Sequence, residues 1–470
     1  MVGFVTKHEW RRYLRDGRFR TLMTSVLVLM AFAVMLSLHD YKLTKRQYEE
    51  HLELARLNWE SQTEKDPHDA AHDGTYVIKP IFPLSIMDKG IRQFSGMAVH
   101  LGAHERKQSS LNEAKDYSGM LRFGELNPAF LLIYVLPLLL IFIGYNTFTE
   151  EKERQTLRLM LVQNISTRQM TLGKWSALVL LMIAMWLLLF VFTVVGSIAV
   201  EGSFADHTLG WFGLAGTYLL YFFIFVNVIV LVSALSRSSA FSLTVLLAIW
   251  IVVTLIVPKV STNLAGWYYP FPSLQTFREN INEDQASGLN GHNFWNEAAQ
   301  DFQQKVLEEY GVETIEELPV AYGGLLLAEG EKYESEIYTK HFNLLQDQYT
   351  EQRNIYRWCS ILSPLIPVRF ISMSLARTDY GFLWHFEDEA EKYRVEFNTQ
   401  LNMDIAENAK GVDHYKADEA LWGSIAPFHY QRQPDRQILE NHRLEFGGLL
   451  LWALTSFGLM IGCSRKIKTV

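Results

Sequence analysis

The chain lacks the short motifs that mark the common catalytic sites. It contains no G-x-x-x-x-G-K-[ST] phosphate loop, no G-x-S-x-G nucleophile turn and no H-E-x-x-H zinc motif. The dipeptide Gly173-Lys174 is followed by Trp175 and lacks the leading glycine of a phosphate loop. We therefore expect no nucleotide site, no cofactor and no enzymatic activity in this chain. Acidic residues at 387–391 are explained by the polar face of a helix.

Charged residues are missing from the depths of six long apolar runs. Each run is close to the roughly 20 residues that cross a bilayer, and lipid leaves only helices as a solution where no alternating barrel strands are present. The predicted spans cover residues 21–38, 129–147, 175–200, 209–235, 241–257 and 446–463. Without buried charges along these spans, an ion or proton relay of a secondary transporter is not expected. Pro137 predicts a kink, and Asn146 and Asn227 predict hydrogen bonds between helices.

Lys and Arg are also absent from the short loop 201–208, and this asymmetry gives the orientation. Basic residues gather instead before the first span, between the second and third spans, at Arg237 and in the tail 464–470. We therefore expect both termini to be cytoplasmic. Ala31-Phe32-Ala33 resembles a signal-peptide cleavage site, but hydrophobicity continues to Leu38, which favours an uncleaved anchor.

Cysteine is scarce too, since Cys359 and Cys463 are the only two. They fall on opposite sides of the membrane in this topology, which excludes a disulfide between them. The net charge of −8 sums two compartments and gives no indication of nucleic-acid binding.

Two long polar segments, 39–128 and 258–445, follow the first and fifth spans. Helical patterns cover residues 42–60, 294–310, 330–359, 363–377 and 382–409, whereas 66–74 predicts a loop and 76–84 extended structure. The fold class is thus an all-α membrane protein with six transmembrane helices. Both insertions are expected to pack together as one mainly helical extracytoplasmic domain. Residues 1–20 predict either a helix on the inner membrane surface or a plain basic flank.

The connector 148–174 is dense in charge and lies between the second and third spans. Its charged start is followed by an apolar patch that contains Leu157 and Leu161. Such a helix can dock into a groove of a soluble partner, with its charges fixing the register. A solvated loop that lies along the membrane is the alternative. The residues predicted to contact the partner are Glu150, Glu151, Glu153, Arg154, Thr156, Leu157 and Leu161.

The connector resembles the charged signature of ABC-2 type permeases. The resemblance rests on Glu151-Lys152-Glu153-Arg154-Gln155-Thr156-Leu157, on Leu159 and Leu161, and on Leu172-Gly173-Lys174. Gln155 stands where the family more often has glycine. The order of six spans, with a connector between the second and third, is also similar to that family.

A second resemblance lies in the later insertion. It rests on Ser363-Pro364, residues 372–379, His385-Phe386 and residues 390–394, with Arg377 where glycine is expected. These segments look like the outer domain of an ABC-2 branch that carries a large extracytoplasmic insertion of unknown function and is related to gliding-motility permeases.

The resemblance implies a permease subunit in a bacterial inner membrane. It implies a separate ABC ATPase subunit that binds ATP and Mg²⁺, a second permease of the same or a related chain, and export rather than import. Homodimer and heterodimer both remain open, as does the substrate. The alternative is a membrane-anchored scaffold or sensor whose outer domain binds an envelope protein.

Histidine spacing offers a metal site only as a minor alternative. His68 and His72 are four residues apart and would share one face of a helix that Pro67 could begin. His100 and His104 repeat this spacing. A polar loop with histidines by chance is the preferred interpretation, so no metal is expected.

Overall fold

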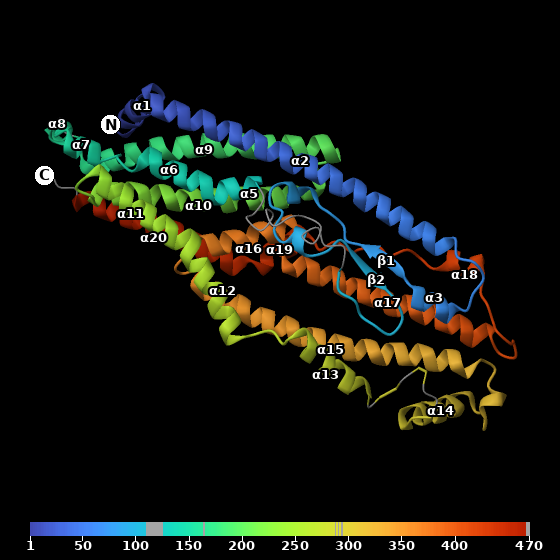
Figure 1. Cartoon of the computed structure of the whole chain (residues 1–470). Coiled ribbons are helices and arrows are strands. Elements are labelled where there is room, and N and C mark those ends of the chain that lie inside the picture. Colours follow the sequence, from blue (N-terminus) through green and yellow to red (C-terminus); the bar gives the residue numbers. More distant parts are fainter. Residues whose placement is uncertain (110–125, 163–164, 287, 290, 293–294, 467–470) are drawn as a thin grey trace.

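The computed structural model describes residues 1–109, 126–162, 165–286, 288–289, 291–292 and 295–466. It is an elongated, largely helical molecule (Figure 1). The N-terminus and the end of the last helix lie together at one end, which we call the terminal end; the opposite end is the distal domain. Six helices are long and apolar enough to cross a membrane. The predicted all-α membrane fold with six spans is therefore confirmed.

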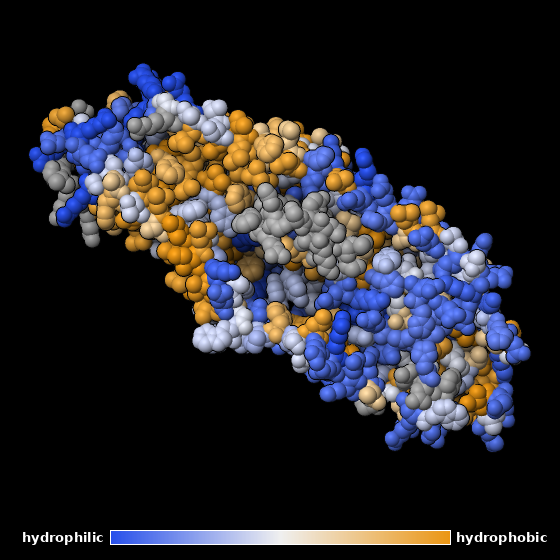
Figure 2. Space-filling model, in the orientation of Figure 1, coloured by the Kyte–Doolittle hydropathy of each residue, from blue (hydrophilic) through white to orange (hydrophobic). Residues whose placement is uncertain are grey.

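Five of the six span helices extend beyond the apolar runs that predicted them, whereas the second ends at Gly144, before the predicted residue 147. Apolar side chains cover the part of the molecule between its two polar ends (Figure 2). The first span is one end of a single helix that runs on into the distal domain, as the polar pattern of residues 42–60 predicted. The helices that form the spans are α2 (Gly17–Glu60), α5 (Pro128–Phe130) with α6 (Leu136–Gly144), α9 (Thr167–Glu201), α10 (Thr208–Leu235), α11 (Ser239–Ile251) with α12 (Val257–Tyr268), and α20 (Arg443–Cys463).

Helix α10 is the centre of the bundle. It packs against α6, α9, α11 and α20, and side chains around its whole circumference are buried. A shorter helix, α16 (Leu365–Ala376), also packs against α10 and α20 through Val368 and Ile371. This segment belongs to the insertion that was predicted to lie outside the membrane, but its apolar residues join the same core as the spans.

Two prolines interrupt span helices, and hydroxyl groups occupy the carbonyls they leave free. Each proline follows a π-helical turn: Leu131–Val135 comes before Pro137, and Val252–Ile256 comes before Pro258. Proline cannot donate a hydrogen bond back to the preceding turn. Tyr221 donates its hydroxyl to the carbonyl of Ile133 at 3.1 Å, and Ser363 donates to Val253 at 2.6 Å. Because lipid supplies no such donors, these side chains make the interruptions tolerable.

Asn227 forms the interhelical hydrogen bonds that its position predicted. Its side-chain amide donates to Ser456 Oγ on α20 at 2.9 Å, and its carbonyl accepts from Trp175 Nε1 on α9 at 2.8 Å. Asn227 therefore joins three spans at a buried point. Asn146 instead donates to Glu150 Oε2, at 2.9 Å.

The two insertions pack together in the distal domain, as expected. Trp59 at the end of α2 donates to the carbonyl of Trp422 at 3.0 Å and lies against the ring of Phe397. The domain also contains the only strands in the described chain, an antiparallel pair with Thr75 opposite Leu101. Its remaining elements are α3 (Pro67–Asp73), β1 (Thr75–Ile78), β2 (Ala98–Leu101), α13 (Leu274–Ala286), α14 (Glu297–Tyr310), α15 (Tyr322–Cys359), α17 (Tyr380–Asn408) and α18 (Glu419–Ser424). Helix α19 (Asp435–Asn441) instead packs against α10, α16 and α20 of the bundle.

Two local predictions were wrong. Residues 66–74 were predicted to be a loop, but they form helix α3, because Asp66 caps the first turn and Pro67 begins it. Helix α15 begins at Tyr322 rather than at residue 330. Gly324 does not break this helix, because it lies against the backbone of Asn402 and Ala406 on α17, where a Cβ atom would clash.

Residues 1–20 were predicted to be either a helix on the inner membrane surface or a plain basic flank, and they contain one helix and the start of a second. Helix α1 (Val2–Arg15) ends at Asp16, whose backbone is extended, and α2 starts at Gly17. Val5 and Tyr13 on one face of α1 are buried, whereas Phe4 and Leu14 are exposed. Helix α1 therefore packs against the bundle, mainly α9, with one side and presents apolar residues on the other.

Candidate functional site

The connector between the second and third spans folds into two short helices at the terminal end. Helix α7 covers Thr149–Glu153 and α8 covers Thr156–Val162 (Figure 1). Gln155 lies between them with a positive φ of 57°. Six of the seven residues predicted to contact a partner have described side chains. The backbone of the seventh, Leu161, is helical, but its side chain lies outside the described part of the structure.

A buried ion triad fixes α7 to the bundle. Lys174 on α9 has no exposed side-chain surface, and its ammonium lies 2.6 Å from Glu9 Oε1 and 2.5 Å from Glu151 Oε1. Each carboxylate is almost fully buried as well. Burial by itself would raise the pKa of the Glu9 carboxyl, but the charges of Lys174 and Arg12 outweigh it and hold that pKa below its usual value. The triad therefore joins α1, α7 and α9 through charged groups.

Sequence reasoning missed Glu9 and the role of Lys174. Glu9 is one of two acidic residues, with Asp16, in the mainly basic segment 7–20, and nothing in the sequence pairs it with Lys174. Arg12 extends the network, because it pairs with Glu9 at 3.1 Å and with Glu150 at 3.7 Å. Glu150 in turn pairs with Arg154 at 2.8 Å.

Other connector charges hold the turn between α10 and α11. Glu153 accepts hydrogen bonds from the backbone N–H of Ser239 at 2.7 Å and from its hydroxyl at 2.8 Å. Lys152 donates to the carbonyls of Ala234 at 2.5 Å and Ser236 at 2.8 Å. Most charges of α7 thus bind the connector to its own bundle rather than project into solvent.

Helix α8 carries the exposed part of the connector. Leu157 is buried and anchors the helix, and Thr156 Oγ1 donates to the carbonyl of Glu151 at 3.4 Å. Leu159 and Val162 are 65% and 85% exposed. Arg154 is also largely exposed. The terminal end therefore presents two exposed apolar side chains on α8 and an exposed basic side chain at the end of α7.

The left-handed backbone at Gln155 predicts a stability effect. A residue with a Cβ atom loses roughly 1 kcal/mol in this conformation, and glycine does not. Gln155→Gly should therefore raise the thermal unfolding temperature of the detergent-purified chain, with a gain of about 0.5–1 kcal/mol. Gln155→Val should lower it, because a β-branched side chain fits this region worst. Equal melting temperatures for both variants would contradict the assigned backbone.

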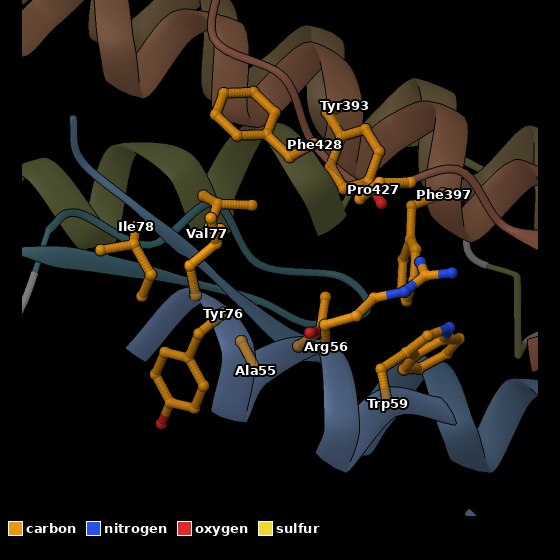
Figure 3. Close-up of a pocket in the computed structure, with 12 residues that line it drawn as sticks. Ala55, Arg56, Trp59, Tyr76, Val77, Ile78, Tyr393, Phe397, Pro427 and Phe428 are labelled. Carbon is orange, nitrogen blue, oxygen red and sulfur yellow. The ribbon is translucent and has the colours of Figure 1, made fainter. Parts of the chain in front are cut away.

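An open groove lies between α2 and the segment before α19. A cavity of about 640 Å³ is lined by aromatic and charged side chains, among them Tyr48, Phe428, Glu49 and Arg432. A smaller adjoining pocket continues toward Trp59 (Figure 3). In Figure 3, Arg56 lies between the ring of Trp59 and the rings of Tyr393 and Phe428. The size and mixed lining are typical of sites for small amphipathic molecules.

The histidines considered as minor metal candidates do share a helix face. His68 and His72 lie on α3, with ring centroids 4.7 Å apart. The structure brings His104 and His292 to the same place, whereas His100 lies elsewhere and contacts the carbonyl of Asp73 at 2.9 Å. No spacing in the sequence indicated His292 as a member of this group.

Two family models match the chain. Residues 95–254 match the model described as "ABC-2 family transporter protein", and this range contains the connector and the second to fourth spans. Residues 275–431 match the model described as "Domain of unknown function (DUF3526)", which covers most of the later insertion. No curated protein matches the chain.

Proposed function

Because this chain is a membrane permease of the ABC-2 transporter family with an additional domain, we propose that α7 and α8 couple it to a separate ATPase subunit. The sequence has no phosphate-binding loop, so ATP and Mg²⁺ belong to that partner. Two permeases, equal or related, would pair with two ATPases. The observation that carries the proposal is the exposed apolar face of α8, fixed to the bundle by the buried triad.

Helix α8 is suited to insertion into a groove of a soluble partner. Exposed apolar side chains on a short helix are typical anchors of such contacts. Leu159 and Val162 supply these anchors, and Arg154 supplies a charge that could set the register. Movement of the partner would reach α9 through Lys174 and α1 through Glu9.

The terminal end is assigned to the cytoplasm of a bacterial cell. Lys and Arg are concentrated in α1, in the connector and after α20, which favours that side of the inner membrane. The distal domain then lies outside. The groove beside α2 would receive substrate that leaves the spans, which supports export, and its lining favours an amphipathic molecule.

Substitution of the exposed apolar residues tests the coupling proposal. The tagged chain is purified in mild detergent, partners are identified by mass spectrometry, and ATPase activity is measured in the eluate. With the double variant Leu159→Glu/Val162→Glu, the amount of co-purified ATPase subunit should fall about tenfold or more. A loss of roughly 1.4 kcal/mol of binding free energy has that effect. Both side chains are exposed, so the fold should persist.

Val412→Glu is the matched control, because Val412 is an exposed valine in the distal domain. It should leave the recovered ATPase unchanged. Full recovery of the ATPase with the double variant would contradict the proposal. Recovery of envelope proteins without any nucleotide-binding subunit, from the unmodified chain, would instead favour the scaffold or sensor.

A further inference from the structure

Four histidines converge at one point of the distal domain. His68 and His72 project from α3, His104 follows β2, and His292 precedes α14. Each offers one ring nitrogen, and these four atoms all lie within 4.8 Å of one another. Histidines from three separate segments of both insertions therefore meet at one site, of which the sequence spacing paired only His68 and His72.

The distances among three of these nitrogens are close to those around a tetrahedral metal ion, and His72 completes the set within 4.8 Å. His68 Nε2 lies 3.4 Å from both His104 Nε2 and His292 Nε2, and the last two atoms are 2.8 Å apart. Zinc–imidazole bonds of roughly 2.0–2.1 Å place two ligands of a tetrahedron about 3.3 Å apart. Two of the three separations match this value, and the third needs a shift of only a few tenths of an ångström.

The other ring nitrogens are held in the manner of metal-ligating histidines. His104 Nδ1 lies 2.8 Å from Glu334 Oε2 and 3.1 Å from Glu331 Oε1. His68 Nδ1 lies 3.1 Å from the side-chain oxygen of Asn402. A carboxylate or amide oxygen at Nδ1 fixes the proton there and leaves Nε2 as the electron-pair donor. Helix α17 thus orients the ring of His68, and α15 orients the ring of His104.

This arrangement is unfavourable without a cation. With protons fixed on Nδ1, the unprotonated Nε2 atoms of His68 and His104 face each other at 3.4 Å.

We propose that His68, His72, His104 and His292 bind one Zn²⁺ ion. Imidazole nitrogens suit zinc, and four ligands in a tetrahedron are typical of structural zinc sites. The ion would link α3 and the segment after β2, both in the first insertion, to the segment before α14 in the second. His72 and His292 are exposed, so zinc can enter from solvent without opening the domain.

Zinc binding by the full-length chain tests the proposal. Detergent-purified chain is stripped with a chelator, dialysed against Zn²⁺ and analysed for bound metal and for thermal unfolding. We expect one zinc per chain and a higher unfolding temperature with zinc than without, because the ion binds the folded state only. Below about pH 6 binding should weaken, since the imidazoles must lose protons to bind.

Two variants keep the outcome independent of folding. His72→Ala/His292→Ala removes two exposed ligands, and it should lose the zinc and its effect on unfolding while its metal-free unfolding temperature stays unchanged. Glu334→Gln should weaken affinity about 10–100-fold, as loss of a partner of a ligating histidine does. His429→Ala, an exposed histidine outside the cluster, should behave as the unmodified chain.

The proposal is overturned if the unmodified chain binds no zinc, or if the His72→Ala/His292→Ala variant binds as much as the unmodified chain. Binding of Cu²⁺ or Ni²⁺ alone, with zinc excluded in competition, would overturn the choice of metal. None of these results depends on the ATPase partner, so the test is independent of the function proposed above.

Discussion

Lys174→Met should destabilise the detergent-purified chain by about 3–5 kcal/mol, because it leaves two buried carboxylates without their counter-charge. Lys174 is fully buried and contacts both Glu9 and Glu151. Arg12 would still neutralise part of the charge on Glu9, whereas the only ion-pair partner that the structure shows for Glu151 would be gone. The expected result is a large fall in thermal unfolding temperature and in yield from membranes.

Two further variants separate the buried charge from general damage. Arg154→Met removes an exposed ion pair with Glu150 and should change stability by less than about 1 kcal/mol. Glu9→Gln/Glu151→Gln/Lys174→Met removes all three charges and should recover much of the loss, because no charge then remains buried without a partner. If Lys174→Met melts like Arg154→Met, the triad does not hold the terminal end together.

Arg394→Met should destabilise the distal domain by a similar amount, about 3–5 kcal/mol. Arg394 is buried and binds Glu391 through two parallel hydrogen bonds of 2.9 Å. It also binds Glu331 at 2.8 Å and the carbonyl of Gly102 at 3.1 Å. Opposing charges keep the pKa of Arg394 above its usual value despite its burial, so the guanidinium is charged in the folded state. The measurement is thermal unfolding of the purified chain.

Lys392→Met provides the matched control on the same helix. Lys392 pairs with Asp388 and Glu389 at 3.0 Å, but its side chain is largely exposed, so its loss should cost less than about 1 kcal/mol. Equal effects of the two variants would show that the buried arginine contributes no more than a surface lysine. Because Glu331 also contacts His104, Arg394→Met should in addition weaken zinc binding.

The spans could be predicted from sequence because their signal is local. A run such as 175–200 is apolar from end to end, and lipid permits only one backbone solution for it. Helix α16 could not be placed in the same way. It is too short to span, and only the folded chain shows that Val368 and Ile371 pack against α10.

The candidate sites depended on contacts between distant residues. Glu9 and Lys174 are separated by more than one hundred and sixty positions, and no periodicity relates them. The spacing of His68 and His72 was visible, but the interpretation as a loop hid it. Of their partners, His104 follows a strand and His292 precedes a helix, and no spacing rule applies at either position.

The two departures from the family pattern were informative. Gln155 and Arg377 stand where glycine was expected, and both have a positive φ, of 57° and 54°. Both positions therefore adopt the backbone form that glycine favours. At Arg377 the guanidinium binds Asp435 at 2.6 Å and the carbonyl of Gln433 at 2.7 Å, contacts that glycine could not make.

The continuity of α2 has a mechanical consequence. This helix runs unbroken from Gly17, next to α1, to Glu60 in the core of the distal domain (Figure 1). At 1.5 Å per residue, its 44 residues form a rod about 66 Å long. If its terminal end were held fixed, a tilt of about 5° would displace the far end by about 6 Å, roughly one helical turn. A small rotation of α2 inside the bilayer would therefore produce a large displacement of its far end, beside the groove and the histidine cluster. No hinge within the helix would be needed.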